Sequence, residues 1–596
     1  MRSWFKVLVA VSLGVVAMAK GGEAAKNAKS AKSEVATGNL SKMRRDELTA
    51  KIGEIKAFLE KSSNTNAVRL LNFAAEVERE VRNKKFGLVF EEHRERVDVE
   101  LAENLPVLTE VKKRFLATKN TKSTKKDESP LNFLIEGDNL AALKLLEKTH
   151  RGKIDVIYID PPYNTGNKDF IYNDSYVDKT DTFRHSKWLS FMKKRLEIAK
   201  RLLSDNGLIF ISIDDNEQAG LKLLCDAIFG ECNFVTNFSW MRTATASNLS
   251  HTIRQKMEYV LCFRRNELSF VLNGGLTDGG DVPLLNAANK IAEIVLPKES
   301  LDLRIDDGLY PKGKYDKIEL TSDFIVKNGV AKTDLKIKGR FKWAQETVED
   351  EISKGTYFII KTKKFSVRFQ RAEKSIKAPS NLITKDECNV GTNEEGNEVI
   401  KQLFGESVFS YSKPPSLIKY LVRMHQNSSA TVLDFFAGSG TTGHAVMKLN
   451  AEDGGKRKFI LVTNNESGIC EKVTYERLKR VMKKEKYAAR LKYFKVDYVP
   501  IKDKVYYEYA DELLRHIREL VELENAIDFN ADGEIAIAET DKEFERFMAS
   551  ESKMAGKKAI YVGHDVLMGR AAQEKLKRMG IEVKVIPEYY YSEEES

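Results

Sequence analysis

The sequence predicts an α/β protein with a doubly wound, mostly parallel sheet. Continuous apolar segments alternate with amphipathic helical patterns over residues 131–266, and the alternation resumes over residues 406–500. Strands that are buried on both faces are apolar throughout, and the helices between them cover those faces. In each half, a turn-rich loop directly follows a strand, at the edge where sheets of this class bind ligands.

The apolar patterns place the expected elements. The first half should contain strands at 133–135, 156–159 and 208–213, with helices over 139–146 and 189–203. The second half should contain a strand at 431–435, a helix over 442–449 and a strand at 459–462. Short basic and aromatic segments separate the halves, so residues 267–405 are interpreted as an insertion into one sheet domain.

Both ends of the chain carry further segments. Leu48, Ile52, Ile55 and Leu59 form one apolar helical stripe, and we expect a helical segment and linker over residues 43–130, with helix to about Leu116. Residues 501–596 have a strand–helix–strand pattern typical of a small α/β appendage.

Residues 1–42 resemble a secretory signal peptide. Arg2 and Lys6 precede the apolar run 7–18, which is followed by Ala19. The run is shorter than the roughly 20 apolar residues that a spanning helix needs. The alternative is a start codon assigned too early, with translation from Met18 or Met43.

The composition excludes little. The chain has 98 Lys and Arg against 88 Asp and Glu, and this excess of +10 is only weak support for a polyanionic partner. The five cysteines lack C-x-x-C spacing, and the histidines form no ligand pattern, so we expect no bound metal.

Two motifs carry the chemistry. The strand ending at Ile159 leads into Asp160-Pro161-Pro162-Tyr163, a rigid loop because proline fixes the backbone and removes a donor. The alternative is an ordinary turn with an N-capping acid. The second motif begins at Asp434 and contains Phe436, Gly438 and Gly440, where small residues let a ligand approach the backbone.

The glycine loop has no G-K-[ST] signature, so ATP is not favoured. Glu466 follows the next strand, a position where such folds bind ribose hydroxyls, although it would equally suit the N-terminus of a helix.

These motifs resemble the D-P-P-Y and F-x-G-x-G motifs of amino-methyltransferases. The stretches from Ile135 to Asn139 and from Phe409 to Pro415 also resemble DNA adenine methyltransferases, and the motif order is that of the beta class. Over residues 132–482 the chain is most similar to the modification (Mod) subunits of type III restriction-modification systems. The resemblance implies a circularly permuted, Rossmann-like methyltransferase fold that uses S-adenosyl-L-methionine.

The resemblance also implies roles for single residues. Asp160 and the Pro161 carbonyl would accept hydrogen bonds from the target amino group, and Tyr163, after Pro162, would stack on a flipped base. Asp at the first motif position favours adenine over cytosine. The cofactor's amino-acid moiety would be bound by Asp434, Phe436, Gly438 and Gly440, its ribose by Glu466 and its adenine by Asp138.

The insertion is expected to recognise the target sequence in double-stranded DNA. Its stretch 336–374 has eleven basic and five acidic residues, interleaved with the aromatic residues Phe341, Trp343, Tyr357, Phe358, Phe365 and Phe369. We expect these rings to form the core of a small β-rich domain with basic groups on its face; the alternative is direct contact with bases.

Several alternatives stay open. The same site would serve a cytosine-N4 or RNA methyltransferase, and a non-catalytic DNA-binding protein is the alternative outside enzymes, which the intact motifs speak against. The resemblance implies a cytoplasmic homodimer without membrane segments. Since the sequence has no Walker or DEAD-box motif, ATP-driven cleavage would need a separate restriction (Res) subunit.

Overall fold

A computed structural model describes residues 40–61, 66–82, 90–118, 129–167, 169–172, 175–245, 252–276, 281–372, 376–504, 506–529, 533–563 and 565–586. The chain divides into two compact units, residues 1–89 and 90–596. The signal-like run at 7–18 lies outside the described residues.

The first unit contains two packed helices, α2 (Leu40–Glu60) and α3 (Ala67–Arg82). Ile52 from the predicted stripe and Ala67 are buried between them, and Lys56 pairs with Glu78 at 2.5 Å. The helix expected from the stripe is therefore present. Leu48 and Ile55 remain about 40% exposed, because two helices bury only part of their apolar surface.

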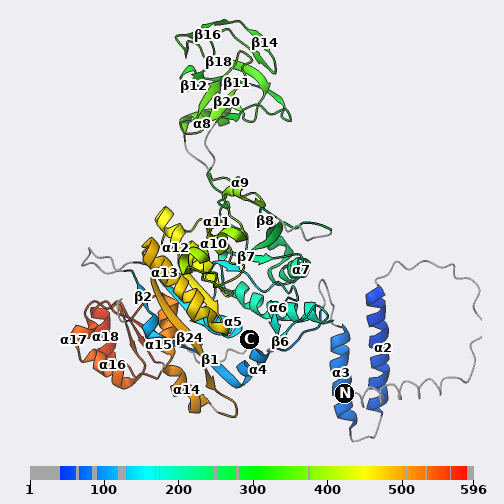
Figure 1. Ribbon diagram of the computed structural model, residues 1–596, viewed down its shortest axis with the longest axis vertical. Helices are drawn as coiled ribbons and strands as arrows, with labels where there is room; N and C mark the ends of the chain where they lie inside the picture. The colour runs from blue at the N-terminus through cyan, green and yellow to red at the C-terminus, as the bar shows by residue number, and fades with distance from the viewer. Residues whose placement is uncertain are drawn as a thin grey trace, which may run out of the picture. The chain divides into compact units, whose positions relative to one another are not determined.

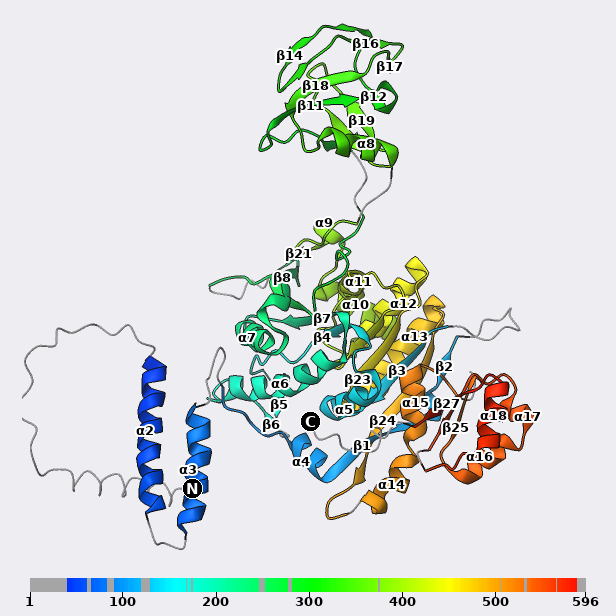
Figure 2. The same cartoon turned by 180° about the vertical axis from the view of Figure 1, so that it is seen from behind.

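The second unit is built on one eleven-stranded sheet (Figures 1 and 2). Its strand order is β1 (Asn104–Glu110), β24 (Arg490–Pro500), β3 (Leu131–Glu136), β23 (Lys458–Thr463), β22 (Thr431–Asp434), β4 (Ile154–Ile159), β7 (Leu203–Ile213), β9 (Met257–Arg264), β8 (Phe234–Met241) and β21 (Leu382–Ile383), with β2 (Leu116–Ala117) beside β24. The run from β24 to β7 is parallel. The predicted doubly wound sheet is confirmed.

Two sets of helices cover this sheet. One set is α5 (Asn139–His150), α6 (Arg184–Leu202) and α7 (Gln218–Phe229); the other is α11 (Pro415–Arg423), α12 (Thr441–Asp453) and α13 (Glu476–Glu485). From β4 the chain crosses through α6 to β7, whereas from β22 it crosses through α12 in the opposite direction to β23. Right-handed crossovers in opposite directions place α6 and α12 on opposite faces of the sheet.

The helical expectation up to Leu116 is wrong in part. After α4 (Arg96–Glu103) the chain becomes β1, which pairs antiparallel with β24. Leu105 and Val107 alternate toward the core, and this short period-two pattern is easily taken for a continuing helix. Residues 90–118 therefore belong to the unit that contains the sheet.

The insertion contains a β-rich body over residues 281–372. Its elements are β10 (Val282–Pro283), β11 (Ile291–Leu296), β12 (Leu301–Leu303), β13 (Gly308–Tyr310), β14 (Gly313–Tyr315), β15 (Ile318–Leu320), β16 (Phe324–Lys327), β17 (Val330–Ala331), β18 (Leu335–Arg340), α8 (Gln345–Ser353), β19 (Tyr357–Ile360) and β20 (Arg368–Gln370). Phe341, Phe358, Phe365 and Phe369 are buried in its core, as expected. After it, β21 returns to the main sheet, followed by α9 (Lys385–Cys388) and α10 (Asn393–Phe404).

The C-terminal segment contains the predicted strand–helix–strand pattern. Helices α14 (Tyr506–Leu514) and α15 (Ile517–Asn525) precede a three-stranded parallel sheet of β25 (Ile535–Ala538), β26 (Ala559–Val562) and β27 (Glu582–Val585), with α16 (Asp541–Met548), α17 (Glu551–Met554) and α18 (Arg570–Arg578). Across all the described helices, none combines the length and apolar character needed to span a bilayer.

A buried charge cluster joins α15 to the main sheet. Lys492 on β24 is fully buried and lies 2.6 Å from Glu522, 3.1 Å from Asp528 and 3.2 Å from Glu110 on β1. Burial and neighbouring acids hold the pKa of Glu522 above its usual range despite this lysine. Lys492 therefore pairs with three carboxylates, and Arg518 lies 3.9 Å from Glu522 as a second cation.

We expect Lys492→Met to lower the free energy of unfolding by about 3–5 kcal/mol, because it removes the buried ammonium that pairs with three carboxylates. Their pKa values would rise in the folded state, so part of the lost stability should return as the pH is lowered. Urea unfolding at several pH values measures both effects. Lys558→Met, which removes an exposed ion pair with Glu534, is the control and should change little. Equal behaviour of the two variants would contradict the role of Lys492.

Candidate active site

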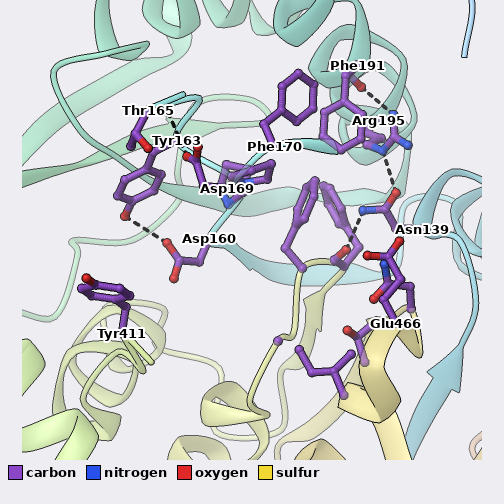
Figure 3. Close-up of a pocket in the computed structure, with 18 of the residues that line it drawn as sticks. Asn139, Asp160, Tyr163, Thr165, Asp169, Phe170, Phe191, Arg195, Tyr411 and Glu466 are labelled. Atoms are coloured by element: carbon purple, nitrogen blue, oxygen red, sulfur yellow. Dashed lines mark hydrogen bonds between the residues drawn. The ribbon is translucent and has the colours of Figure 1, made fainter. Parts of the chain in front are cut away.

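A cavity of about 970 Å³ lies where the loops after β3, β4, β22 and β23 meet (Figure 3). The structure brings most of the predicted site residues to its wall: Asp138, Asp160, Pro161, Pro162, Tyr163, Phe436, Gly438 and Glu466. Asp434 and Gly440 do not line it. The two motifs meet because β4 and β22 are hydrogen-bonded neighbours, pairing Val432 with Val156 and Leu433 with Ile157.

Neighbouring residues hold the loop that carries Asp160. Trp188 on α6 is fully buried, and its indole nitrogen donates to the Pro162 carbonyl at 2.6 Å. Asn164 is buried with a left-handed backbone (φ 56°), and its amide donates to Glu217 at 2.5 Å. The loop is thus held by hydrogen bonds as well as by its prolines, which suits a group that must be positioned before reaction.

Two polar groups contact the Asp160 carboxylate. The ammonium of Lys413 lies 2.9 Å from both carboxylate oxygens, and the Tyr163 hydroxyl donates to Oδ1 at 3.0 Å. The same hydroxyl is 3.3 Å from Glu258 on β9. Burial, followed by the charges of Asp160 and Glu258, raises the pKa of Tyr163 well above its usual value, so the phenol stays neutral.

Lys413 and Glu258 line the same cavity, and the sequence interpretation did not assign either of them. Lys413 is buried and lies 3.7 Å from Glu258, which is buried too and pairs with Arg242 at 3.3 Å. Burial disfavours the Lys413 ammonium, but the two carboxylates outweigh it and raise its pKa. Two carboxylates and two cations therefore balance each other's charge here. The sequence signal for Lys413 was its place directly after the stretch from Phe409 to Ser412.

The glycine loop depends on positive φ angles. Gly438 has φ 47° and Gly440 φ 77°, and a Cβ at Gly440 would lie 3.0 Å from the Thr474 side chain. Gly440 thus permits close packing behind the loop, whereas Gly438 faces the cavity.

Asp434 supports this loop from within the core. It is 2% exposed, accepts from the Phe436 backbone at 3.0 Å and accepts from the Thr442 hydroxyl. Burial raises its pKa to about 7 despite these hydrogen bonds, and the charge of Asp160 adds to the effect. Asp434 therefore supports the loop from behind and does not line the cavity, and its expected contact with the cofactor stays a prediction.

The other end of the cavity is lined by Asp138, Glu466 and aromatic rings. Asp138 accepts from the Leu140 backbone at 2.7 Å as the N-cap of α5 and keeps part of its carboxylate exposed. Buried Arg195 stacks on Phe191 and forms two 3.0 Å hydrogen bonds to Glu95. These contacts tie the segment before α4 to this end of the site, a feature the sequence interpretation missed.

Residues 154–476, just over half of the chain, match the N6/N4 DNA methylase family. The chain belongs to this family. The match includes both motifs, and it confirms the predicted DNA methyltransferase family.

Curated relatives support this membership. The Mod subunit of the type III restriction-modification enzyme StyLTI from Salmonella typhimurium is 36% identical over 56% of this chain and 53% of its own length. The EcoPI Mod subunit of Escherichia phage P1 is 31% identical over 61% of this chain and 62% of its own. The type II methyltransferase M.KpnI from Klebsiella pneumoniae is 33% identical, over 57% and 82% respectively. The chain thus spans about half to three fifths of the two Mod subunits.

Asp434→Asn should remove a pH dependence from stability. With a folded pKa of about 7 and an ordinary value of 3.8, folded Asp434 keeps its proton where the unfolded chain has lost it. Stability should therefore fall as the pH rises from about 4 to about 7, by up to about 4 kcal/mol, and level off above. In Asp434→Asn this slope should be absent. Urea midpoints against pH test this, with exposed Asp386→Asn as the control; a slope unchanged by Asp434→Asn would contradict it.

Proposed function

We propose that this protein transfers a methyl group from S-adenosylmethionine to the 6-amino group of adenine in duplex DNA. The observation that carries the proposal is the shared cavity, in which Asp160 and Gly438 stand on the loops of two adjacent parallel strands. A methyl donor bound at the glycine loop would lie beside a base bound at Asp160. The adjacency supplies the proximity that methyl transfer between two bound molecules needs.

The residues of the cavity suit attack by a weak nucleophile. An adenine amino group shares its lone pair with the ring, and hydrogen bonds to Asp160 and the Pro161 carbonyl would favour a more tetrahedral nitrogen. When bound, the cofactor would supply an electrophilic methyl group on a sulfonium sulfur; the amino nitrogen that accepts the methyl would leave a neutral thioether behind and would give up one proton to solvent. Asp160 would stabilise the positive charge that develops on nitrogen.

Lys413 and Glu258 would set the electrostatics of this step. A cation beside Asp160 weakens the stabilisation that its carboxylate offers to a positive nitrogen, and Glu258 restores negative charge nearby. Because Lys413 contacts both Asp160 oxygens, a bound amino group must share or displace one of these hydrogen bonds. We infer that Lys413 is a positioning residue that orients Asp160.

We further propose that the protein is a modification subunit of a type III restriction-modification system, acting as a cytoplasmic homodimer with a possible Res subunit. The two Mod relatives support this assignment. Within it, the β-rich body at 281–372 would read the DNA sequence, because it is inserted between the two motif-bearing halves and contributes no residue to the cavity.

Methylation of cytosine N4 is the second candidate, because the family includes N4 enzymes. Host DNA from cells with and without the gene, digested to nucleosides and analysed by mass spectrometry, decides between them. N6-methyladenine that depends on the gene supports the proposal. N4-methylcytosine, or no modified base, would overturn it, and sequencing for modified bases then gives the recognition motif.

Asp160→Ala should reduce methyl transfer by about a hundred- to thousandfold while cofactor binding persists, since it removes a contact needed mainly in the transition state. Gly438→Asp should instead weaken cofactor binding, because its positive φ strains any side chain and an added anion repels the cofactor's carboxylate. Calorimetry with S-adenosylmethionine and a tritiated-methyl assay separate the two defects. Near-normal transfer by Asp160→Ala would refute the mechanism.

Exchanging residues 281–372 for the matching segment of a relative should change which DNA sequence is methylated and leave the methylated atom unchanged. The body has its own core, so the exchange need not disturb the sheet. Sequencing of methylated host DNA compares the two motifs. An unchanged motif in an active chimera would argue against this role, and methylation of a different atom would argue against a site separate from the insertion.

A further inference from the structure

Tyr411 stands out among the residues that line the cavity. Its side chain is 75% exposed, among the highest values for a large apolar residue in the described chain. In Figure 3 the Tyr411 ring lies at the end of the cavity marked by Asp160 and Tyr163, although it comes from the segment before α11. An aromatic ring left in water at the mouth of a ligand site has apolar surface available to a ligand.

The backbone at Tyr411 is also unusual. Its φ of 62° lies in the left-handed region, which costs a bulky residue free energy and persists only where the surroundings impose it. The surroundings do so here through the next residue. Ser412 is 1% exposed, its backbone donates to Asn397 at 3.1 Å, and its hydroxyl lies 3.1 Å from that of Ser439 in the glycine loop.

The same short segment contacts both motifs. Phe409 packs beside Gly438, with 3.6 Å between its ring and the place of a Cβ there, and Lys413 binds Asp160. Tyr411 lies between these two contacts in sequence. The segment is therefore anchored at the cofactor loop and at the catalytic carboxylate, and the strained turn between the anchors directs one ring outward.

We propose that Tyr411 stacks on the target base once the base has left the duplex, as a second aromatic wall in addition to Tyr163. The inference rests on the proposed function and names a residue that holds its substrate. Tyr163 has its hydroxyl fixed by Asp160 and Glu258, and the Lys413 ammonium lies 5.0 Å from its ring centre. A base against that rigid ring needs a cover on its other side, and an exposed ring on a held backbone provides one.

Four substitutions separate stacking from backbone geometry. Tyr411→Phe and Tyr411→Trp keep an aromatic ring, whereas Tyr411→Asn and Tyr411→Gly suit the left-handed backbone and remove the ring. If stacking matters, Phe and Trp should stay within a few-fold of wild type. Asn and Gly should lose about ten- to hundredfold in kcat/KM for DNA, the usual range for one base–aromatic stack. If only the turn matters, Asn and Gly should retain activity.

The assays use the full chain, tritiated S-adenosylmethionine and a duplex that carries the motif found by sequencing. A second duplex with 2-aminopurine at the target position reports the base directly: its fluorescence should be higher with Tyr411→Gly than with wild type, because a stacked base is quenched. Cofactor affinity by calorimetry should be unchanged in all four variants. Leu567→Ala, which removes another exposed apolar side chain, is the control.

The outcomes distinguish the two levels of the proposal. If the wild-type protein does not methylate adenine, the proposed function itself is wrong. Active wild-type protein together with Tyr411→Gly of equal kcat/KM and equal 2-aminopurine signal overturns the role of Tyr411. A loss in Tyr411→Gly that equals the loss in Tyr411→Phe also overturns it, because the hydroxyl and not the ring would then be responsible.

Discussion

The pairing of β4 with β22 is the constraint on which the rest of the site depends. These strands are adjacent and parallel although about 275 residues separate them, a spacing set by register pairs such as Val156 with Val432. The crossovers leave them in opposite directions, so the loops after both strands face one crevice. Either strand could come first in the chain without changing this geometry, which explains how the catalytic loop can precede the glycine loop.

Elements that lie between β4 and β22 in the sequence also contribute residues to the cavity. Strand β9 supplies Glu258, and the segment after α10 supplies Lys413. Both charged groups are buried, where an unpaired charge is costly. Lys413 is neutralised by Asp160 and Glu258 from distant parts of the chain. Glu258 is also paired with nearby Arg242. The cavity is thus charge-balanced only after the whole sheet has formed, and the β-rich body between 281 and 372 contributes nothing to that balance.

The strands and helices of both halves could be predicted from the sequence, because buried parallel strands and amphipathic helices leave strong periodic signals. Asp160 and Gly438 could be predicted because proline and glycine carry local meaning. Strand β1 could not, since its signal is only Leu105 and Val107, and its partner β24 follows nearly 400 residues later. The role of Lys413 depends on a contact across 253 residues, which no local pattern encodes.

Asp434 shows that a position in a motif does not by itself define what the side chain does. Its place at the end of β22 suggested a ligand contact. In the structure the buried carboxylate instead accepts a hydrogen bond from the loop's own backbone at Phe436. Fully buried Arg477 acts from the other side: its guanidinium donates to the hydroxyls of Ser439 and Thr441 at 2.9 and 2.7 Å, and burial lowers its pKa to about 9. Burial beneath one loop thus disfavours the charged forms of both side chains. Where few water molecules reach, backbone N–H groups interact more strongly with an anion than they would in water. The low solvent exposure of the residues beneath the glycine loop would therefore strengthen its binding of a carboxylate.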